Sequence, residues 1–413
     1  MSTPLRILFL LTQDLDSPGG LGRYFPLARA LAERGHQVKI AALHPNWAGI
    51  SERRFVKDGV QVEYVAPMHV IKVGSQKKYY SPLRLIGVVL RATWALTRVA
   101  LTTPADIIQV GKPHPMNSLA GLLAQSLQGK ALCVDCDDYE MANLHFGGGW
   151  QKFGVQVFEI LAPRRADAVT AHTHFLRDHL ISLGVTPEHF TYLPHGADHK
   201  RFAQVDQAQV ERIRAELGLA GKQVVAFIGS LSLPSHPVEL LLEAFQRVHA
   251  ARPQAVLLIV GGGEEYDRLV KRAQELELGE AVIFRGRVPG NEPPLYCRLA
   301  DVQAEPVIDN TVGRSSLPLK MFESWVSGVP FITGDVGDRG MVMGNPPAGL
   351  LVRPGDPEAL AEAILQILSD PELAAELRAR GFARADEYSW ERLAERMEAV
   401  YLKVSKPQHG SRR

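Results

Sequence analysis

Three cysteines in 413 residues are too few for a disulfide framework, which favours a reducing compartment. Cys133 and Cys136 form a lone C-x-x-C inside an apolar run, and with no second pair to complete a zinc site we interpret them as buried thiols. Net charge is also scarce, at +1, and gives no support for nucleic-acid binding. No uninterrupted apolar run reaches the ~20 residues that span a bilayer. The N-terminal apolar run is short and is followed by Gln13, so we expect a core strand rather than a signal peptide, and a cytoplasmic protein.

Acidic residues are absent from one long segment, between Tyr64 and Ala105. A helix is predicted over residues 83–101, after Pro82 and before Pro104. Its three arginines recur every seven residues and form one narrow stripe beside a broad apolar surface. The segment's basic residues are Lys72, Lys77, Lys78, Arg84, Arg91 and Arg98. This pattern is typical of an interfacial helix and predicts an anionic membrane surface as partner, with the protein peripheral on the inner face. The alternative is a core helix with a solvated arginine edge.

Two segments predict Rossmann-like units. Residues 6–11, 21–34 and 38–43 read as strand, helix and strand, with Gly19 and Gly20 in the first turn. A second such unit begins with the strand over residues 224–228, followed by Gly229. The fold class is therefore α/β with two doubly wound parallel sheets. The first glycine cluster, which also includes Gly22, does not have the dinucleotide-binding spacing, so a tight strand-to-helix turn explains it as well as phosphate binding does.

Polar residues follow two further predicted strands of the first unit. His114 comes after residues 106–110, and Asp137 comes after residues 131–134. Strand-end loops of this kind line the ligand crevice of parallel sheets. A lone histidine is more often structural than catalytic, and the three aspartates around Asp137 could be a metal site or a polar loop. We assign no metal and no cofactor.

Residues 314–334 predict a loop, a short helix and a buried strand. Lys320 and Glu323 lie three apart on one face of that helix. The pattern P-x-K-x-x-E-x-x-x-x-G-x-P, from Pro318 to Pro330, resembles the nucleotide-clamping helix of family 4 glycosyltransferases. The stretch from Gly19 to His36 is similar to the opening of the same enzymes. A surface Lys–Glu pair and an ordinary turn are the alternatives for the two segments taken singly.

The resemblance implies the GT-B fold, with two Rossmann-like domains facing across a cleft. It places an N-terminal acceptor domain at residues 1–202, a nucleotide-sugar domain at 203–388, a helix crossing back at 389–404, and a disordered tail at 405–413. The implied function is transfer of a sugar from a nucleotide-sugar donor to an acceptor hydroxyl, with retention at the anomeric carbon. The acceptor would be a sugar or a lipid-linked molecule, such as a glycolipid or cell-surface polysaccharide precursor.

The resemblance also assigns roles to residues. Glu323 would grip the ribose, a diol that a carboxylate suits because both its oxygens accept hydrogen bonds. Lys320 and Arg314 would bind the diphosphate, and Arg287 lies where the family holds the base. Backbone N–H groups near the donor would come from Gly19, Gly20, Gly229 and Ser230. Asp137 and His114 would contact the transferred sugar or the acceptor hydroxyl.

The sequence departs from the family in three places. Ser230 and the stretch at 234–236 stand where the family usually has an arginine and a lysine for the diphosphate. Asp137 replaces a histidine, and His195 replaces an asparagine. Two alternatives follow: a nucleotide-sugar 2-epimerase of the same fold, and a membrane-associated binding protein without transferase chemistry.

Overall fold

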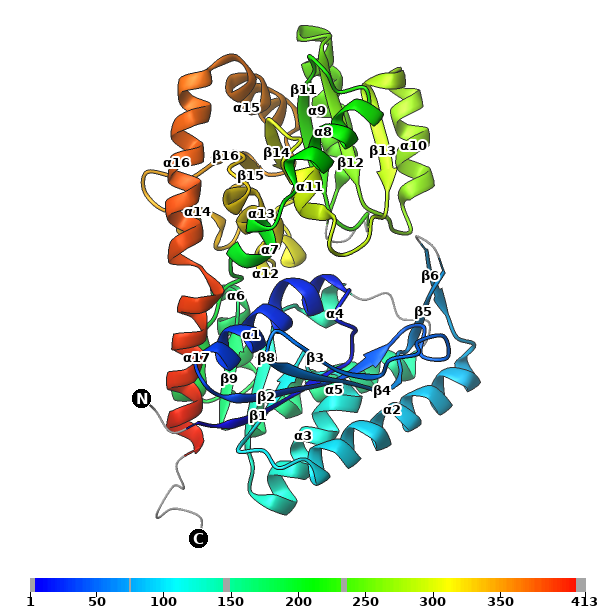
Figure 1. Ribbon diagram of the computed structural model, residues 1–413, viewed down its shortest axis with the longest axis vertical. Coiled ribbons are helices and arrows are strands. Elements are labelled where there is room, and N and C mark those ends of the chain that lie inside the picture. Colours follow the sequence, from blue (N-terminus) through cyan, green and yellow to red (C-terminus); the bar gives the residue numbers. More distant parts are fainter. Residues whose placement is uncertain (1–3, 74–75, 144–148, 232–235, 406–413) are drawn as a thin grey trace. The chain divides into compact units, whose positions relative to one another are not determined.

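The computed structural model describes residues 4–73, 76–143, 149–231 and 236–405 (Figure 1). The chain divides into two compact units. Unit 1 comprises Met1–Lys72, Lys78–Pro194 and Trp390–Arg413, and unit 2 comprises Val73–Lys77 and His195–Ser389. The predicted tail lies outside the described residues, except for Ser405, which ends a helix.

Unit 1 is built on an eight-stranded sheet in the order β10-β9-β8-β7-β1-β2-β4-β3, parallel except for the edge strand β3. Apolar side chains fill both faces, as a sheet covered by helices on both sides requires. Its strands are β1 (Arg6–Leu11), β2 (Gln37–His44), β3 (Arg54–Lys57), β4 (Val60–Pro67), β7 (Ile107–Gly111), β8 (Ala131–Cys136), β9 (Ala168–Ala171) and β10 (Phe190–Tyr192). A separate two-stranded sheet pairs β5 (Val70–Val73) with β6 (Gln76–Tyr79).

Two sets of helices cover the sheet of unit 1. One face packs against α1 and α17, and the other against α2, α3, α5 and α6. The helices of unit 1 are η1 (Gly20–Tyr24), α1 (Phe25–Glu33), α2 (Pro82–Thr102), α3 (Pro115–Gln128), α4 (Glu140–Asn143), α5 (Gly149–Arg165), α6 (His174–Ser182), η2 (Pro187–His189) and α17 (Trp390–Ser405).

Unit 2 contains a six-stranded parallel sheet in the order β13-β12-β11-β14-β15-β16. Its strands are β11 (Gln223–Ile228), β12 (Ala255–Val260), β13 (Val282–Gly286), β14 (Val302–Glu305), β15 (Phe331–Gly334) and β16 (Leu350–Val352). Its helices are α7 (His199–Ala203), α8 (Gln207–Glu216), α9 (Val238–Ala251), α10 (Tyr266–Glu275), η3 (Gly279–Ala281), α11 (Pro293–Cys297), α12 (Thr311–Ser315), α13 (Leu319–Val326), α14 (Arg339–Met343), α15 (Pro357–Ser369) and α16 (Pro371–Glu387). The two faces carry separate apolar clusters, one with α9 and α15 and one with α13.

Unit 2 begins at His195, before the boundary predicted at residue 202. Phe202 itself is fully buried in the core of unit 2. Ala197 pairs with Ser389, and its N–H donates to the carbonyl of Tyr388 at 2.9 Å, which ties both ends of unit 2 together. The sequence patterns also did not predict β3, the β5–β6 pair or α5, whose apolar residues do not follow one clear face and which contains Pro163.

Each parallel sheet has one point where the strand order reverses. In unit 1 it lies between β1 and β7, and in unit 2 between β11 and β14. Ligands of open α/β sheets bind at the carboxyl ends of the strands at such points. The chain therefore presents two candidate sites, one in each unit.

Candidate active site

His114 bridges the two strand ends at the reversal point of unit 1. Its Nδ1 lies 2.9 Å from Oγ1 of Thr12, which follows β1, and its Nε2 lies 3.2 Å from Oε2 of Glu140. His114 itself follows β7 and precedes α3, whose first residue is Pro115. With both ring nitrogens engaged, the imidazole is held at the centre of this edge.

Lys112 lies among three carboxylates beside His114. Its ammonium donates to Asp138 and to Oε1 of Glu140 at 3.1 Å, and lies 3.8 Å from Oδ1 of Asp137. Burial would lower the pKa of Lys112, but the carboxylates outweigh it and raise the pKa well above its ordinary value. The backbone of Lys112 is in the left-handed region at φ +54°, a strained conformation that active sites often hold.

The three carboxylates could also be considered as metal ligands, since one oxygen from each lies within 4.8 Å of the others. The Lys112 ammonium already occupies that cluster and supplies positive charge to it. We therefore assign no metal here.

Asp137 is the carboxylate that this cluster leaves least satisfied. It is 4% exposed, and its Oδ1 has no hydrogen-bond partner among the described residues. Burial raises its pKa to about 7, with Lys112 opposing and Asp138 adding to the rise. Behind it, burial and the Glu140 charge raise the pKa of Glu159 to about 8. A carboxyl group that titrates near neutrality can exchange a proton or a hydrogen bond with a bound hydroxyl.

Gly19 and Gly20 lie in the first helical turn after β1. A Cβ on Gly20 would lie 2.0 Å from the carbonyl oxygen of Asp14, so only glycine fits. Leu21 N–H donates to the Ser17 carbonyl at 2.8 Å, so that N–H group is used within the turn.

Arg23 is a buried residue of this turn that sequence reasoning missed. Its guanidinium binds both carboxylate oxygens of Asp135, the last-but-one residue of β8, at 2.7 Å each. It also donates to the carbonyls of Leu193 and Pro194 at 3.0 and 3.2 Å. A glycine-rich turn followed by an arginine was the available signal, but its partner lies over a hundred positions away.

Unit 2 brings Lys320 and Gly229 together at its reversal point. A Cβ on Gly229, which follows β11, would lie 3.0 Å from Cε of Lys320 on α13. The ammonium of Lys320 donates to Oε1 of Glu305, the last residue of β14, at 3.0 Å. Lysine, glycine and glutamate therefore meet where the two strands end.

Glu305 also gathers two groups that were not predicted. Arg339 Nη2 lies 3.6 Å from its Oε2, and His236 Nδ1 lies 3.6 Å from its Oε1. Burial would raise the pKa of Glu305, but Lys320, Arg339 and His236 lower it overall. Burial and the nearby Lys320 lower the pKa of His236 to about 3, so this imidazole is neutral at physiological pH. A glutamate at a strand end was the signal that could have identified Glu305.

Glu323, one turn along α13 from Lys320, is paired with another residue. Its Oε1 accepts from Arg201 Nη1 at 2.8 Å, and both side chains are about seven-eighths buried. Arg201, on α7, also donates to the carbonyl of Gly290 at 3.0 Å. The carboxylate is thus oriented by a partly buried arginine.

Two groups predicted to contact the donor, the Arg314 guanidinium and the Gly229 N–H, have other partners in this structure. Arg314 is half-exposed and pairs with Asp309 at 2.5 Å, so Arg339 rather than Arg314 shares the carboxylate of Lys320. The N–H of Gly229 donates to the Val260 carbonyl at 2.9 Å within the sheet and does not point to a ligand. The physical reason is sheet pairing, because this glycine still continues the β11 ladder.

Ser230 and Arg287 lie at the ends of neighbouring segments of unit 2. Ser230 is half-buried after β11, and Arg287 is exposed directly after β13. The residues at 232–235, which include part of the stretch that replaces the usual lysine, lie outside the described part of the chain.

Comparisons with known proteins match both units. Residues 19–196 match the glycosyl transferase 4-like domain, and residues 209–384 match the glycosyl transferases group 1 domain. The chain is 29% identical over 396 residues to a GDP-mannose-dependent alpha-(1-6)-phosphatidylinositol monomannoside mannosyltransferase of Mycolicibacterium smegmatis, covering 93% of this chain and 95% of that protein. It is also 29% identical over 426 residues to D-inositol 3-phosphate glycosyltransferase 1 of Catenulispora acidiphila, covering 97% and 96%.

Solved structures support the fold. Sucrose-phosphate synthase from Thermosynechococcus elongatus superposes with a TM-score of 0.76 at 20% identity, covering 97% of this chain and 99% of that one. Anabaena HepE in complex with UDP-glucose gives 0.71 at 18% identity, covering 96% and 100%. These likenesses confirm the GT-B fold class.

The relatives also bear on the two alternative functions. The proteins from Mycolicibacterium smegmatis and Catenulispora acidiphila both carry transferase names, and neither supports the 2-epimerase alternative. Each unit of this chain matches a glycosyltransferase domain over its own parallel sheet. The chain therefore belongs to the family 4 glycosyltransferases, as the residue pattern from Pro318 to Pro330 indicated.

Proposed function

We propose that this glycosyltransferase acts with retention on a lipid-linked acceptor at an anionic membrane surface, from the cytoplasmic side. The observation that carries this proposal is the exposed surface of α2. Its exposed surface is apolar and basic, and relatives of similar length are named for transfer to phosphatidylinositol mannosides or to inositol phosphate. The donor is a nucleotide-sugar, and the hexosyl group goes to an acceptor hydroxyl.

In unit 2, the donor would be held by its diphosphate and ribose. Lys320 and Arg339 are buried cations at the strand-end edge, and a departing nucleoside diphosphate needs positive charge near its β-phosphate. Glu305 keeps both cations paired and in place. Glu323, oriented by Arg201, offers carboxylate oxygens to the ribose diol. Arg287 lies where the base would be held.

In unit 1, Asp137 and His114 are the proposed contacts to the transferred sugar or the acceptor hydroxyl. Asp137 has an unsatisfied buried oxygen and a pKa near neutrality, so it can accept a hydrogen bond from a hydroxyl. His114 is fixed by Thr12 and Glu140. Gly19 and Gly20 permit the close turn of this edge. Neither a metal nor a cofactor is part of the proposal.

α2 supports the membrane location through the order of its side chains around the helix. At about 100° per residue, Leu83, Ile86, Leu90 and Trp94 share one arc of about 80°, and the three arginines occupy the next arc. Those four apolar residues are 42–85% exposed. The opposite face is buried in unit 1 through Ala92, Ala95, Leu96 and Ala100.

Among the described residues, α2 alone has the length and composition of a membrane-spanning helix. Because its far face belongs to the core of unit 1, we propose that it lies in the membrane interface and does not cross. The interfacial helix and the core helix, which the sequence left as alternatives, thus correspond to two faces of α2.

The function is tested by incubating the protein with GDP-, UDP- and ADP-sugars and with phosphoinositides in vesicles. We expect one donor to give a glycosylated lipid whose new bond keeps the anomeric configuration, as read by NMR. Transfer to water or to soluble sugars alone would contradict the lipid acceptor, and an inverted product would contradict retention. Absence of sugar release from every donor would favour the binding-only alternative.

The membrane location is tested separately by vesicle sedimentation in low salt. The triple change Arg84→Glu, Arg91→Glu and Arg98→Glu should abolish recruitment to vesicles that contain anionic lipid. Unchanged recruitment would remove the membrane part of the proposal.

A further inference from the structure

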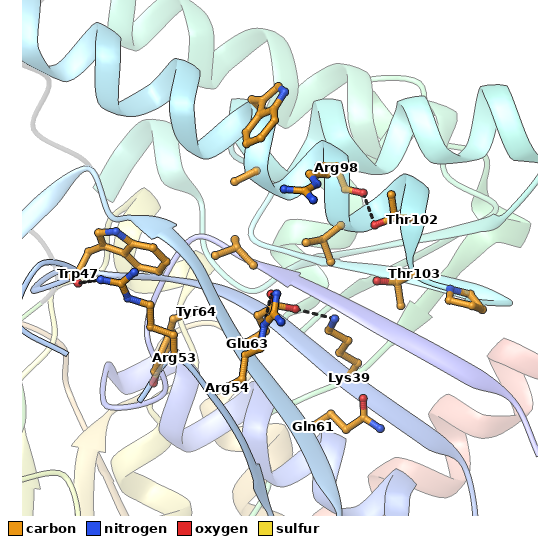
Figure 2. Close-up of a pocket in the computed structure, with 15 residues that line it drawn as sticks. Lys39, Trp47, Arg53, Arg54, Gln61, Glu63, Tyr64, Arg98, Thr102 and Thr103 are labelled. Atoms are coloured by element: carbon orange, nitrogen blue, oxygen red, sulfur yellow. Dashed lines mark hydrogen bonds and ion pairs between the residues drawn. The ribbon is translucent and has the colours of Figure 1, made fainter. Parts of the chain in front are cut away.

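A groove beside α2 is a second feature of unit 1, and its lining contains none of the residues that we assign to sugar transfer. It has a volume of about 920 Å³, within the usual range of ligand sites. Figure 2 shows its side chains: Arg98 comes from α2, while Arg53 and Arg54 come from the segment that opens β3. Lys39 of β2 and Glu63 of β4 lie on the floor.

The groove is rich in positive charge. It contains four basic side chains and one carboxylate, Glu63. Glu63 is shared by Lys39 and Arg54, each at 2.7 Å. Burial would raise the pKa of Glu63, but these two partners lower it, so the carboxylate stays ionised and satisfies those two cations.

Arg53 and Arg98 are different, because no carboxylate pairs with either in the part of the chain that the structure describes. Each instead lies over a tryptophan ring, Arg53 at 4.1 Å from the centroid of Trp47 and Arg98 at 5.6 Å from that of Trp94. Arg53 also donates from Nη2 to the Trp47 carbonyl at 3.3 Å, which fixes its position further. Stacking on an aromatic ring orients a guanidinium while leaving most of its N–H fork open to an oxyanion. Both guanidiniums line the same groove, and each can bind a phosphate oxygen.

The position of the groove next to an apolar surface indicates what kind of phosphodiester would bind there. Trp94 belongs both to the groove and to the exposed apolar arc of α2. A molecule seated in the groove against Trp94 would therefore have its apolar portion next to Leu90, which lies one turn away on α2 and is 65% exposed. Phosphate beside an apolar surface is the arrangement of a phospholipid at the membrane interface.

We propose that the groove between α2 and the β2–β4–β3 edge binds the headgroup phosphate of an anionic membrane phospholipid through Arg53 and Arg98. This rests on the proposed membrane location and adds a defined lipid site to it. The bound headgroup holds α2 at a fixed depth, with the apolar arc among acyl chains. Asp137 and His114 lie at a different place, the edge formed by the carboxyl ends of β7 and β8. The lipid site is therefore separate from them.

The test uses the full chain and a short-chain lipid, dihexanoyl phosphatidylglycerol, below its micelle concentration, followed by isothermal titration. We expect the parent to bind and the pair Arg53→Gln with Arg98→Gln to lose at least about tenfold in affinity. The matched pair Arg84→Gln with Arg91→Gln removes the same charge from α2, outside the groove lining. It should keep soluble-lipid binding within about twofold while weakening recruitment to vesicles.

Equal binding by the parent and the Arg53/Arg98 pair would overturn the proposal. Inorganic phosphate that competes with the lipid at equal concentration would also overturn it, by showing a free-phosphate site. If the double variant does not fold, as judged by thermal unfolding, Thr102→Glu serves instead. Thr102 is exposed and lines the groove, so the new carboxylate should cause the same loss without removing a packed side chain.

The outcome is independent of the catalytic proposal. Release of sugar from a soluble nucleotide-sugar by the parent protein, without lipid, reports the donor site of unit 2. Lipid titration reports the groove of unit 1. Failure of one measurement with success of the other therefore shows which proposal is wrong.

Discussion

At the scale of single residues, both candidate sites pair a largely buried lysine with carboxylate at a sheet's reversal point. Lys112 neutralises the group that contains Asp137, and Lys320 neutralises Glu305. Isolated charges would be expensive to bury, so the pairs hold each other in place before any substrate arrives. In unit 1 the charges are not fully balanced. Burial raises the pKa of Asp137 to about 7 and that of Glu159 to about 8.

Glu159 makes stability depend on pH. Its folded pKa is about 8, raised from the ordinary value of 4.5, so the folded state holds a proton that the unfolded chain releases between about pH 4.5 and 8. The free energy of unfolding should fall as pH rises through that window. Glu159→Gln should flatten the profile and be more stable than the parent at pH 9, by roughly 4 kcal/mol.

Denaturant melts from pH 4 to 9 measure this effect. The exposed Glu188→Gln in the same unit is the control and should follow the parent. A parent profile that rises between pH 5 and 8, with Glu159→Gln parallel to it, would contradict the assignment.

Glu323 should determine donor affinity through the ribose. Glu323→Gln weakens a charge-assisted hydrogen bond, and we expect about a tenfold to hundredfold rise in the Kd for the matching nucleoside diphosphate. Titration calorimetry measures it. Glu358→Gln, an exposed glutamate of unit 2 paired with Arg247, is the control and should bind like the parent. Unaltered affinity in Glu323→Gln would place the ribose elsewhere.

At the scale of elements, η1 and α2 differ in how tightly their glycines are packed and in how much apolar surface they expose. The η1 turn packs so closely on the end of β1 that Gly20 has no room for a side chain. α2 instead carries Gly87 in open space and leaves an apolar arc uncovered. One element is fixed by contact with its own sheet, and the other presents a face to something outside the unit.

These two glycines make a matched pair. Gly20→Ala would place a Cβ 2.0 Å from the Asp14 carbonyl oxygen, so the turn must move, and we expect a loss of about 2 kcal/mol in unfolding free energy. Gly87→Ala meets no atom within 4 Å and should stabilise α2 by up to about 1 kcal/mol, because alanine favours helix. Thermal melts measure both. Equal effects of the two changes would show that the Gly20 contact is not limiting.

At the scale of the whole molecule, the chain leaves unit 1 at Pro194 and returns to it at Trp390. The returning helix, α17, buries Trp390, Leu393, Met397 and Tyr401 in the core of unit 1 next to α1 (Figure 1). Tyr401 also donates to Oε1 of Gln109 at 2.9 Å in the buried sheet. Unit 1 is therefore completed by the last part of the chain, whereas the core of unit 2 is continuous from His195.

Ending the chain after Ser389 should destabilise unit 1 selectively. Calorimetry should show one unfolding transition at a markedly lower temperature and a second one nearly unchanged, since the core of unit 2 keeps all its residues. Arg392→Ala, an exposed change on the same helix, is the control and should not shift the first transition by more than about 2 °C. Equal shifts of both transitions in the truncated chain would contradict this division of the core.

Features that depend on the local order of residues could be predicted from the amino-acid sequence alone. Alternating strand and helix patterns indicated two parallel α/β units, and the residue pattern from Pro318 to Pro330 indicated the family. The seven-residue spacing of arginines predicted the basic stripe of α2. Each of these is set by residues within one or two turns of each other, so periodicity is enough to find it.

Which charged side chains form ion pairs could be seen only in the folded chain. Arg23 forms an ion pair with Asp135. Lys320 shares the carboxylate of Glu305 with Arg339, and not with Arg314. These pairings depend on which strand ends lie next to each other, and strand order in a parallel sheet is set by long crossovers that leave no local pattern. The groove beside α2 has the same origin, because a helix and three strands from separate segments must pack before Arg53 and Arg98 line one cavity.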